Sequence, residues 1–198
     1  MTIPPYDYSL TSLVGHFRKS PYGVVIIAAL TRAVCVNLCR RFADYLTADD
    51  IPVGWISDPG AQVPPLADRK VAPWLLKAKP GSRLDEVVWR IRQMPRQQVV
   101  VIDSQELLPA GGSVGLTRIP RTLLAAIKAI QVPATRLSLL RWEAATHRKL
   151  ICIVVPYPTL WAMSDIGPPD LVPERELGRF AAAWIVAEEP EDPADHSR

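Results

Sequence analysis

The chain has 198 residues, a hydrophobic fraction of 48% and a charged fraction of 22%. These values fit one globular domain with a continuous core and exclude an intrinsically disordered chain. The formal net charge of +3 is too small to establish a nucleic-acid partner without further observations.

Neither export nor a membrane anchor is indicated. The first ten residues contain no basic segment followed by an apolar stretch, and no apolar run approaches the ~20 residues that cross a bilayer. Cys35, Cys39 and Cys152 lack the close pairing of a metal site and lie in apolar patterns, which favours buried free thiols over metal or redox roles. We therefore expect a cytoplasmic protein.

The first part of the chain predicts strands that alternate with helices. Residues 1–20 are interpreted as a lead-in segment with a short helix at 10–17. Residues 22–30 form a continuous apolar run rich in β-branched residues, which is typical of a strand covered on both faces. Apolar positions then recur at helical spacing over residues 33–46, and residues 51–57 predict a second short strand.

The middle of the chain continues this alternation. Residues 73–79 indicate a third short strand, and residues 82–94 predict a helix with Ser82 as its N-cap. Residues 97–104 give the clearest buried strand of the chain, and the apolar part of that strand ends at Asp103.

The last third predicts two helices and two strands. We expect helices at 118–131 and 133–148, separated at Pro133 because proline lacks the N–H donor that a helix requires. A strand over 150–156 and a strand-like run over 179–189 follow.

These elements predict an α/β fold with a mostly parallel sheet and helices on both faces, because the central strands show no polar alternation. We expect one domain over residues 21–188. The lead-in segment 1–20 precedes it, and an acidic disordered tail at 189–198 follows it.

The turn after the first strand lacks the residues that hold a nucleotide. A phosphate loop uses glycines that let backbone N–H groups approach the phosphates, and a lysine that reaches the terminal ones. The corresponding sequence here is AALTRA, with no glycine and no lysine. Thr31, Arg32 and Asp103 therefore mark a degenerate nucleotide site, and we expect no ATPase activity, no cofactor and no metal. Arg32, at a helix N-terminus, could still hold an anion.

Asp103 stands where nucleotide-binding proteins place the acidic residue that holds magnesium. Without a phosphate loop, the simpler interpretation is a polar residue that closes a strand. Glu106 lies close to it in sequence, but carboxylate pairs in loops are common and indicate little.

Basic residues concentrate between positions 118 and 149, where Glu143 is the one acid. This stretch predicts either a basic surface for DNA or an acidic partner, or a solvated helical face. Trp142 is its one aromatic residue, so stacking on single-stranded bases is not indicated. The basic residues are Arg118, Arg121, Lys128, Arg136, Arg141, Arg148 and Lys149.

The C-terminal segment is interpreted either as a solubilising end or as a partner-binding arm. Its candidate contact residues are Trp184, Glu188 and Glu189. Among the six tryptophans, any exposed member would mark a docking site, because tryptophan is enriched in interface hot spots.

Four stretches resemble the RecA-like ImuA/SulA group of bacterial DNA-damage proteins, and together they cover roughly residues 22–188. The second is the most telling, because its W-I-x-x-P strand end leads into a proline-rich loop. The stretches are VVIIAAL with the helix NLCRRFADYL, then PVGWISDPGAQVPPLADRKV, then VVWRIRQMPRQQVVVIDS, and finally RLSLLRWEAATHRKLICIVVP.

The resemblance implies a RecA-like sheet with a degenerate phosphate loop and a non-catalytic adaptor role. Such an adaptor helps to assemble an error-prone translesion DNA synthesis complex, with RecA and a Y-family-like polymerase subunit as partners. The division-inhibitor branch of the same group implies instead a tubulin-like division protein as partner. A third alternative is a divergent nucleotide hydrolase that uses Arg32, Asp103 and Glu106, since WIVAEEPEDP resembles plasmid replication ATPases of the RepA type.

Overall fold

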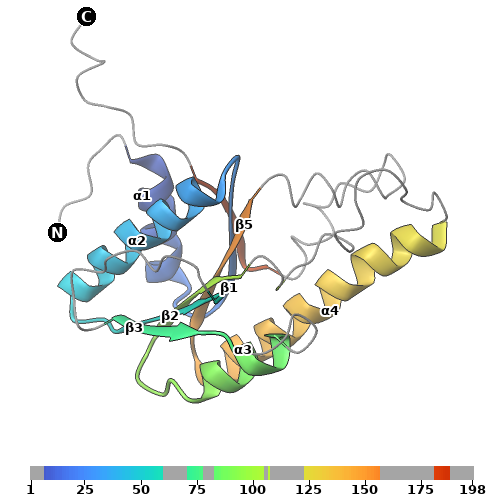
Figure 1. The fold of residues 1–198 in the computed structure, drawn as a ribbon. Coiled ribbons are helices and arrows are strands. Elements are labelled where there is room, and N and C mark those ends of the chain that lie inside the picture. The colour runs from blue at the N-terminus through green and yellow to red at the C-terminus, as the bar shows by residue number, and fades with distance from the viewer. Residues whose placement is uncertain are drawn as a thin grey trace, which may run out of the picture.

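The computed structural model describes residues 7–59, 71–77, 83–104, 107, 123–156 and 181–187 (Figure 1). Strands and helices alternate along these segments. In chain order the elements are α1 (Tyr8–Lys19), β1 (Gly23–Ala29), α2 (Arg32–Ala48), β2 (Val53–Ser57), β3 (Val71–Leu75), α3 (Arg83–Arg92), β4 (Val99–Asp103), α4 (Leu123–His147), β5 (Leu150–Pro156) and β6 (Ala183–Val186).

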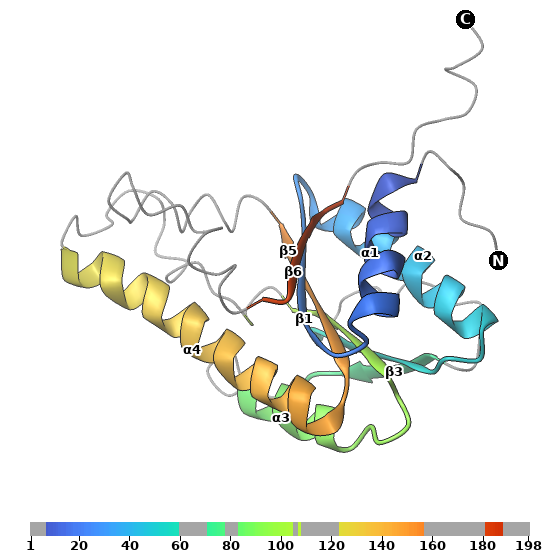
Figure 2. The same ribbon diagram turned by 180° about the vertical axis from the view of Figure 1, so that it is seen from behind.

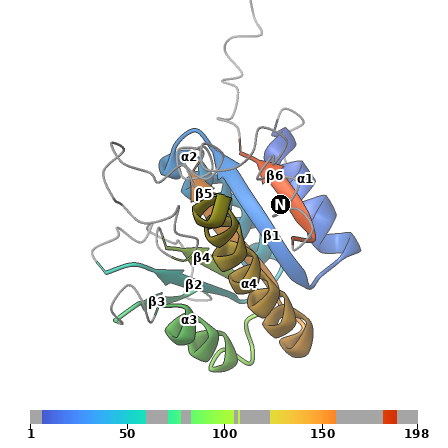
Figure 3. The ribbon, with the colours of Figure 1, turned by 90° about the vertical axis from the view of Figure 1, so that its right-hand side faces the viewer.

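The strands form one six-stranded sheet in the order β3-β2-β4-β5-β1-β6, and every pairing is parallel. Helices α1 and α2 lie on one face of the sheet, and α3 and α4 lie on the other (Figures 1 and 2). Figure 3 looks onto the face that α4 crosses. The expected α/β fold is therefore confirmed, and the sheet is consistent with a RecA-like one.

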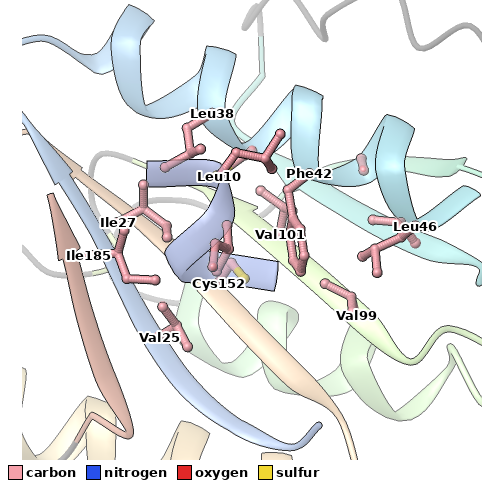
Figure 4. Close-up of a cluster of buried hydrophobic side chains, with 14 of the residues drawn as sticks. Leu10, Val25, Ile27, Leu38, Phe42, Leu46, Val99, Val101, Cys152 and Ile185 are labelled. Atoms are coloured by element: carbon pink, nitrogen blue, oxygen red, sulfur yellow. The ribbon is translucent and has the colours of Figure 1, made fainter. Parts of the chain in front are cut away.

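Each face of the sheet has its own apolar core because successive side chains of a strand point to opposite faces. Val25 and Ile27 of β1 meet Leu38 and Phe42 of α2 in the first core, together with Val101 of β4 (Figure 4). The intervening strand residues face α3 and α4. Strands buried on both faces explain why their sequences are continuous apolar runs.

Helix α1 belongs to the first core. The sequence predicted a short helix at 10–17, and the structure extends it to three turns with Leu13 and Val14 buried. Asp7 caps the helix by accepting from the Leu10 N–H, and Ser9 Oγ donates to the carbonyl of Val186 at 3.1 Å. The N-terminal helix is thereby tied to the last strand of the sheet (Figure 2).

The predicted helix break at Pro133 is wrong, because α4 runs without interruption from Leu123 to His147. A proline inside a helix removes one backbone hydrogen bond at a cost of about 3 kcal/mol, but tertiary packing can outweigh that cost. Leu137, Leu140 and Ala144, one to three turns beyond the proline, are fully buried in the second core.

Two edge strands differ in extent from their predictions. Strand β3 covers Val71–Leu75 instead of 73–79, and β6 covers Ala183–Val186 within the longer run 179–189. Each edge strand begins where it starts to pair with an inner strand. Val71 of β3 pairs with Val53, and Ala183 of β6 pairs with Val25.

The three cysteines are free and buried, as predicted. Within the described segments, no three His, Cys, Asp or Glu side chains are grouped so that they could hold a metal ion. Among those same segments, no helix combines the length and the apolarity needed to cross a bilayer.

Candidate functional site

Five polar residues gather where parallel strands end, and we call them the carboxyl-edge cluster: Arg32, Asp58, Arg83, Asp103 and Ser104. Arg32 is the first residue of α2, and Arg83 is the first residue of α3. The others lie at the ends of β2 and β4. Open α/β sheets bind their ligands at this edge. The connections after β1 and β4 lead to helices on opposite faces, which is the arrangement typical of such sites.

Thr31, the first of the predicted site residues, is the N-cap of α2. Its backbone is extended, and its side chain accepts from the Val34 N–H at 3.4 Å. A threonine at this position satisfies a helix donor that would otherwise lack a partner. Local helix chemistry therefore accounts for this residue.

Arg32 and Asp103 form a forked ion pair. Arg32 Nε donates to Asp103 Oδ1 at 2.7 Å, and Arg32 Nη2 donates to Asp103 Oδ2 at 2.5 Å. The Asp103 side chain is only 2% exposed, whereas that of Arg32 is 31% exposed. Two parallel charge-assisted bonds make this the strongest common form of side-chain ion pair. Because β5 lies between β1 and β4, Arg32 reaches across the end of β5 to meet its partner.

A second ion pair supports the first. Arg83 Nη1 and Ser104 Oγ each donate to Asp58 Oδ1 at 2.7 Å. The Asp58 N–H donates to the carbonyl oxygen of Asp103 at 3.3 Å. The ends of β2 and β4 and the starts of α2 and α3 are thus joined by one polar network.

Burial raises the pKa of Asp103 above its usual value, and the neighbouring Asp58 carboxylate raises it further. The hydrogen bonds and the positive charge of Arg32 act in the opposite direction without cancelling the effect of burial. The ionised form of Asp103 therefore depends on Arg32.

The structure brings Arg32 and Asp103 together, and it explains what the pair can do chemically. Both carboxylate oxygens of Asp103 accept from the guanidinium, so a magnesium ion at this position would have to displace a charged side chain. Asp103 closes β4, as the sequence indicated, and it has a second role. It holds the start of α2 against the end of β4. Glu106 lies outside the described residues.

The structure describes only part of the predicted basic surface between residues 118 and 149. Arg118 and Arg121 lie outside the described residues, and Lys128 lies in the first half of α4. Arg136 is half-buried and donates to the carbonyl oxygen of Leu107 at 2.9 Å. Burial lowers its pKa. Arg141 and Arg148 are exposed.

Lys149 does not belong to this surface, because its side chain is buried. Its Nζ donates to the carbonyl oxygen of Gln97 at 2.6 Å and also to that of Met94. Both carbonyls lie in the connection between α3 and β4. Without Lys149 they would lose this donor. Burial lowers the pKa of Lys149. The prediction failed because nothing in the local sequence distinguishes this lysine from the exposed Arg148.

Glu143, the one acid of the basic stretch, is fully buried. Its Oε2 accepts from Arg92 Nε at 3.1 Å and its Oε1 accepts from Arg92 Nη2 at 2.5 Å, and His147 Nε2 lies 3.3 Å from Oε2. This carboxylate therefore joins α4 to α3 and does not offset the charge of the exposed arginines.

The C-terminal candidates are only partly described. Trp184 lies in β6, where it pairs with Ile26 of β1. Glu188 and Glu189 lie outside the described residues.

The sequence interpretation missed Asp58 and Arg83. Asp58 directly follows a buried strand, which is the same signal that identified Asp103. Arg83 could not be found from its neighbours, because its partner is 25 residues away.

The cluster is an internally neutralised polar site at the ligand-binding edge of a parallel sheet. Neither the models of known protein families nor the curated proteins give a match to this chain.

Proposed function

We propose that this protein is a non-catalytic RecA-like adaptor of the bacterial DNA-damage response, which helps to assemble an error-prone translesion DNA synthesis complex. The observation that carries the non-catalytic part is the Arg32–Asp103 pair. The carboxylate that would hold magnesium in a nucleotide hydrolase is bound instead by an arginine of the same chain. The turn between β1 and α2 contains neither glycine nor lysine, so it lacks the groups that bind phosphates in a phosphate loop.

The adaptor role and its partners rest on the sequence resemblance described above. RecA and a Y-family-like polymerase subunit are the partners it implies, and both act in the cytoplasm. A parallel sheet consistent with a RecA-like one supports the resemblance, because a RecA relative that has lost its nucleotide site can keep the scaffold on which partners dock.

Nucleotide binding is the first test. A ligand present at about 100 times its Kd stabilises the folded state by about 2.7 kcal/mol, so binding would raise the melting temperature. We expect no shift with millimolar Mg²⁺–ATP or Mg²⁺–ADP, and no heat of binding in calorimetry. Saturable binding would instead support the divergent hydrolase.

Partner capture is the second test. The tagged full chain is purified from cells with and without DNA damage, and co-purifying proteins are identified by mass spectrometry. We expect RecA or a polymerase-like subunit to be enriched after damage. Recovery of the tubulin-like division protein alone would replace the adaptor proposal with that of a division inhibitor, and recovery of none of these proteins would remove both.

A further inference from the structure

Away from the carboxyl-edge cluster, β3 and α3 meet in a corner that carries stacked aromatic and cationic side chains. We call Trp74, Leu75, Trp89 and Arg90 the indole corner. The guanidinium carbon of Arg90 lies 4.6 Å from the ring centroid of Trp74 and 4.8 Å from that of Trp89. Arg90 is thus held between two indoles by cation–π contacts.

Trp89 is 51% exposed, and Leu75 of the edge strand is also exposed. Trp74 is half-buried against the second core. One side of Trp89 therefore contacts Arg90, and much of the remaining ring surface is open to solvent. A half-exposed indole that is fixed by a neighbour is a ready surface for another planar group.

Glu86 joins the two elements of the corner through two hydrogen bonds. Its Oε1 accepts from Arg90 Nη2 at 3.4 Å, one turn along α3, and its Oε2 accepts from the Lys77 N–H at 2.8 Å. The first bond fixes the guanidinium between the indoles. The second ties α3 to the segment that follows β3.

The outer edge of β3 is poorly suited to the addition of another strand. The Leu76 N–H donates inward to the Ser57 carbonyl, so the backbone nitrogens of Pro73, Leu75 and Lys77 face outward. Pro73 has no N–H, and that of Lys77 is already bound by Glu86. A ligand at this corner must therefore bind to side-chain surfaces instead of extending the sheet.

The charge around the corner selects an anionic ligand. Among the described residues next to the corner, Lys77 and Arg92 are exposed, against one exposed acid, Asp85. Arg92 lies nearly one helical turn beyond Trp89, and although it pairs with Glu143 its side chain remains half-exposed.

We propose that the indole corner binds single-stranded nucleic acid, with a base stacked on Trp89 and the phosphates near Lys77 and Arg92. A single strand combines planar faces with a regular negative charge, which is what an indole among basic side chains recognises. The sequence had given no indication of stacking, because the aromatic residues of the corner lie outside the basic stretch of 118–149. This inference stands on the contacts of the corner and does not rest on the proposed adaptor role.

Fluorescence anisotropy with the purified full chain tests the proposal. The probes are labelled oligothymidylate and oligouridylate of about 20 nucleotides, a length that exceeds the site of a single small domain. Trp89→Ala should weaken binding about 5- to 100-fold, as expected for the loss of one stacked base, and Trp89→Phe should keep most of the affinity. Lys77→Ala should lower the salt dependence by about 0.7 in log Kd per log salt concentration.

Trp142→Ala is the matched control, because Trp142 is 56% exposed on α4 and has no arginine stacked on it among the described residues. It should bind the oligonucleotides as the unmodified chain does. Equal losses for the Trp89 and Trp142 variants would overturn the proposal, as would a duplex that binds as tightly as the single strand.

A poly-glutamate peptide separates an acidic protein partner from a nucleic acid. Trp89-dependent binding of the peptide, without binding of either oligonucleotide, would also overturn the proposal. Preference for oligothymidylate or for oligouridylate identifies the natural ligand as DNA or RNA. Circular dichroism verifies that each variant folds. These assays contain no partner protein, so their outcome is independent of the adaptor test.

Discussion

Arg32 and Asp103 are 71 residues apart in sequence, yet the guanidinium of one donates to both carboxylate oxygens of the other. The pair spans the end of β5 and joins α2 to β4. Its two members differ in exposure, since the carboxylate is buried and the guanidinium is partly open to solvent. That asymmetry determines how the protein should respond when either partner is removed.

Arg32→Ala should destabilise the protein by about 3 kcal/mol at neutral pH, because it leaves a buried carboxylate without its counter-charge. Without Arg32 the pKa of Asp103 should rise further above its unfolded value. A carboxyl with a raised folded pKa binds its proton more tightly when folded, so stability falls as pH rises between the unfolded and folded pKa values. The loss should therefore be smaller near pH 4 than near pH 7 in urea denaturation.

Asp103→Asn is the companion variant. It removes the buried negative charge, and Arg32 can turn to solvent. The loss of stability should therefore be smaller than for Arg32→Ala, about 1–2 kcal/mol. In the double variant Arg32→Ala/Asp103→Asn, the two effects should not add, because the buried charge is gone. A loss for Arg32→Ala that is the same at both pH values, or effects that add in the double variant, would show that the pair contributes no such coupling.

The strands and α2 could be predicted because their apolar patterns are local. Continuous β-branched runs marked β1, β4 and β5 almost to the residue, and Asp103 was found as the polar residue that ends a buried strand. Thr31, Arg32 and Asp103 were grouped together because they stand where nucleotide-binding proteins place the phosphate loop and the acid that holds magnesium. Their contact could not be predicted in detail, since it depends on β5 lying between β1 and β4.

The failures have one physical cause in common. Lys149 is buried because carbonyls more than 50 residues away accept its hydrogen bonds, and α4 passes Pro133 because the packing of later residues sustains it. The stack of Trp74, Arg90 and Trp89 likewise needs β3 and α3 to meet. Each depends on tertiary contacts that leave no pattern in the neighbouring sequence.

Lys149→Ala should cost about 2–4 kcal/mol, because it removes charge-assisted hydrogen bonds and leaves the carbonyls of Met94 and Gln97 without this donor. Arg148→Ala, at the exposed neighbouring position, should change stability by about 0.5 kcal/mol or less. Urea denaturation of both variants at neutral pH measures the contrast. Similar losses would mean that the ammonium of Lys149 does not support the connection between α3 and β4.

The buried thiols should make the protein sensitive to alkali. Burial raises the pKa of Cys35 and that of Cys152 to about 12, and it raises that of Cys39 well above its usual value. The folded thiols keep their protons when the unfolded ones lose theirs, so stability should fall as pH rises above about 9, by up to about 1.4 kcal/mol per pH unit for each thiol.

Cys152→Ala provides the measurement for this prediction. The variant should lose stability less steeply than the unmodified chain between about pH 9 and pH 11 in urea denaturation, whatever its stability at neutral pH. A thiol-specific reagent should also fail to label the native protein near pH 8 and should label all three cysteines after unfolding. Rapid labelling of the native chain would contradict the burial of the thiols.

Pro133→Ala should stabilise the protein. Since α4 is continuous, the proline lies in a helix interior, where it lacks an N–H donor and where alanine is preferred by about 3 kcal/mol. The unfolded chain gains flexibility when the proline is removed, so the net gain should be smaller, about 1–2 kcal/mol. Thermal and urea denaturation measure it, with Ser138→Ala, at an exposed position of the same helix, as the control for helix propensity. If Pro133→Ala gained no more stability than the control variant, α4 would instead be two helices separated at Pro133. A proline in a turn between helices has no helical hydrogen bond to regain.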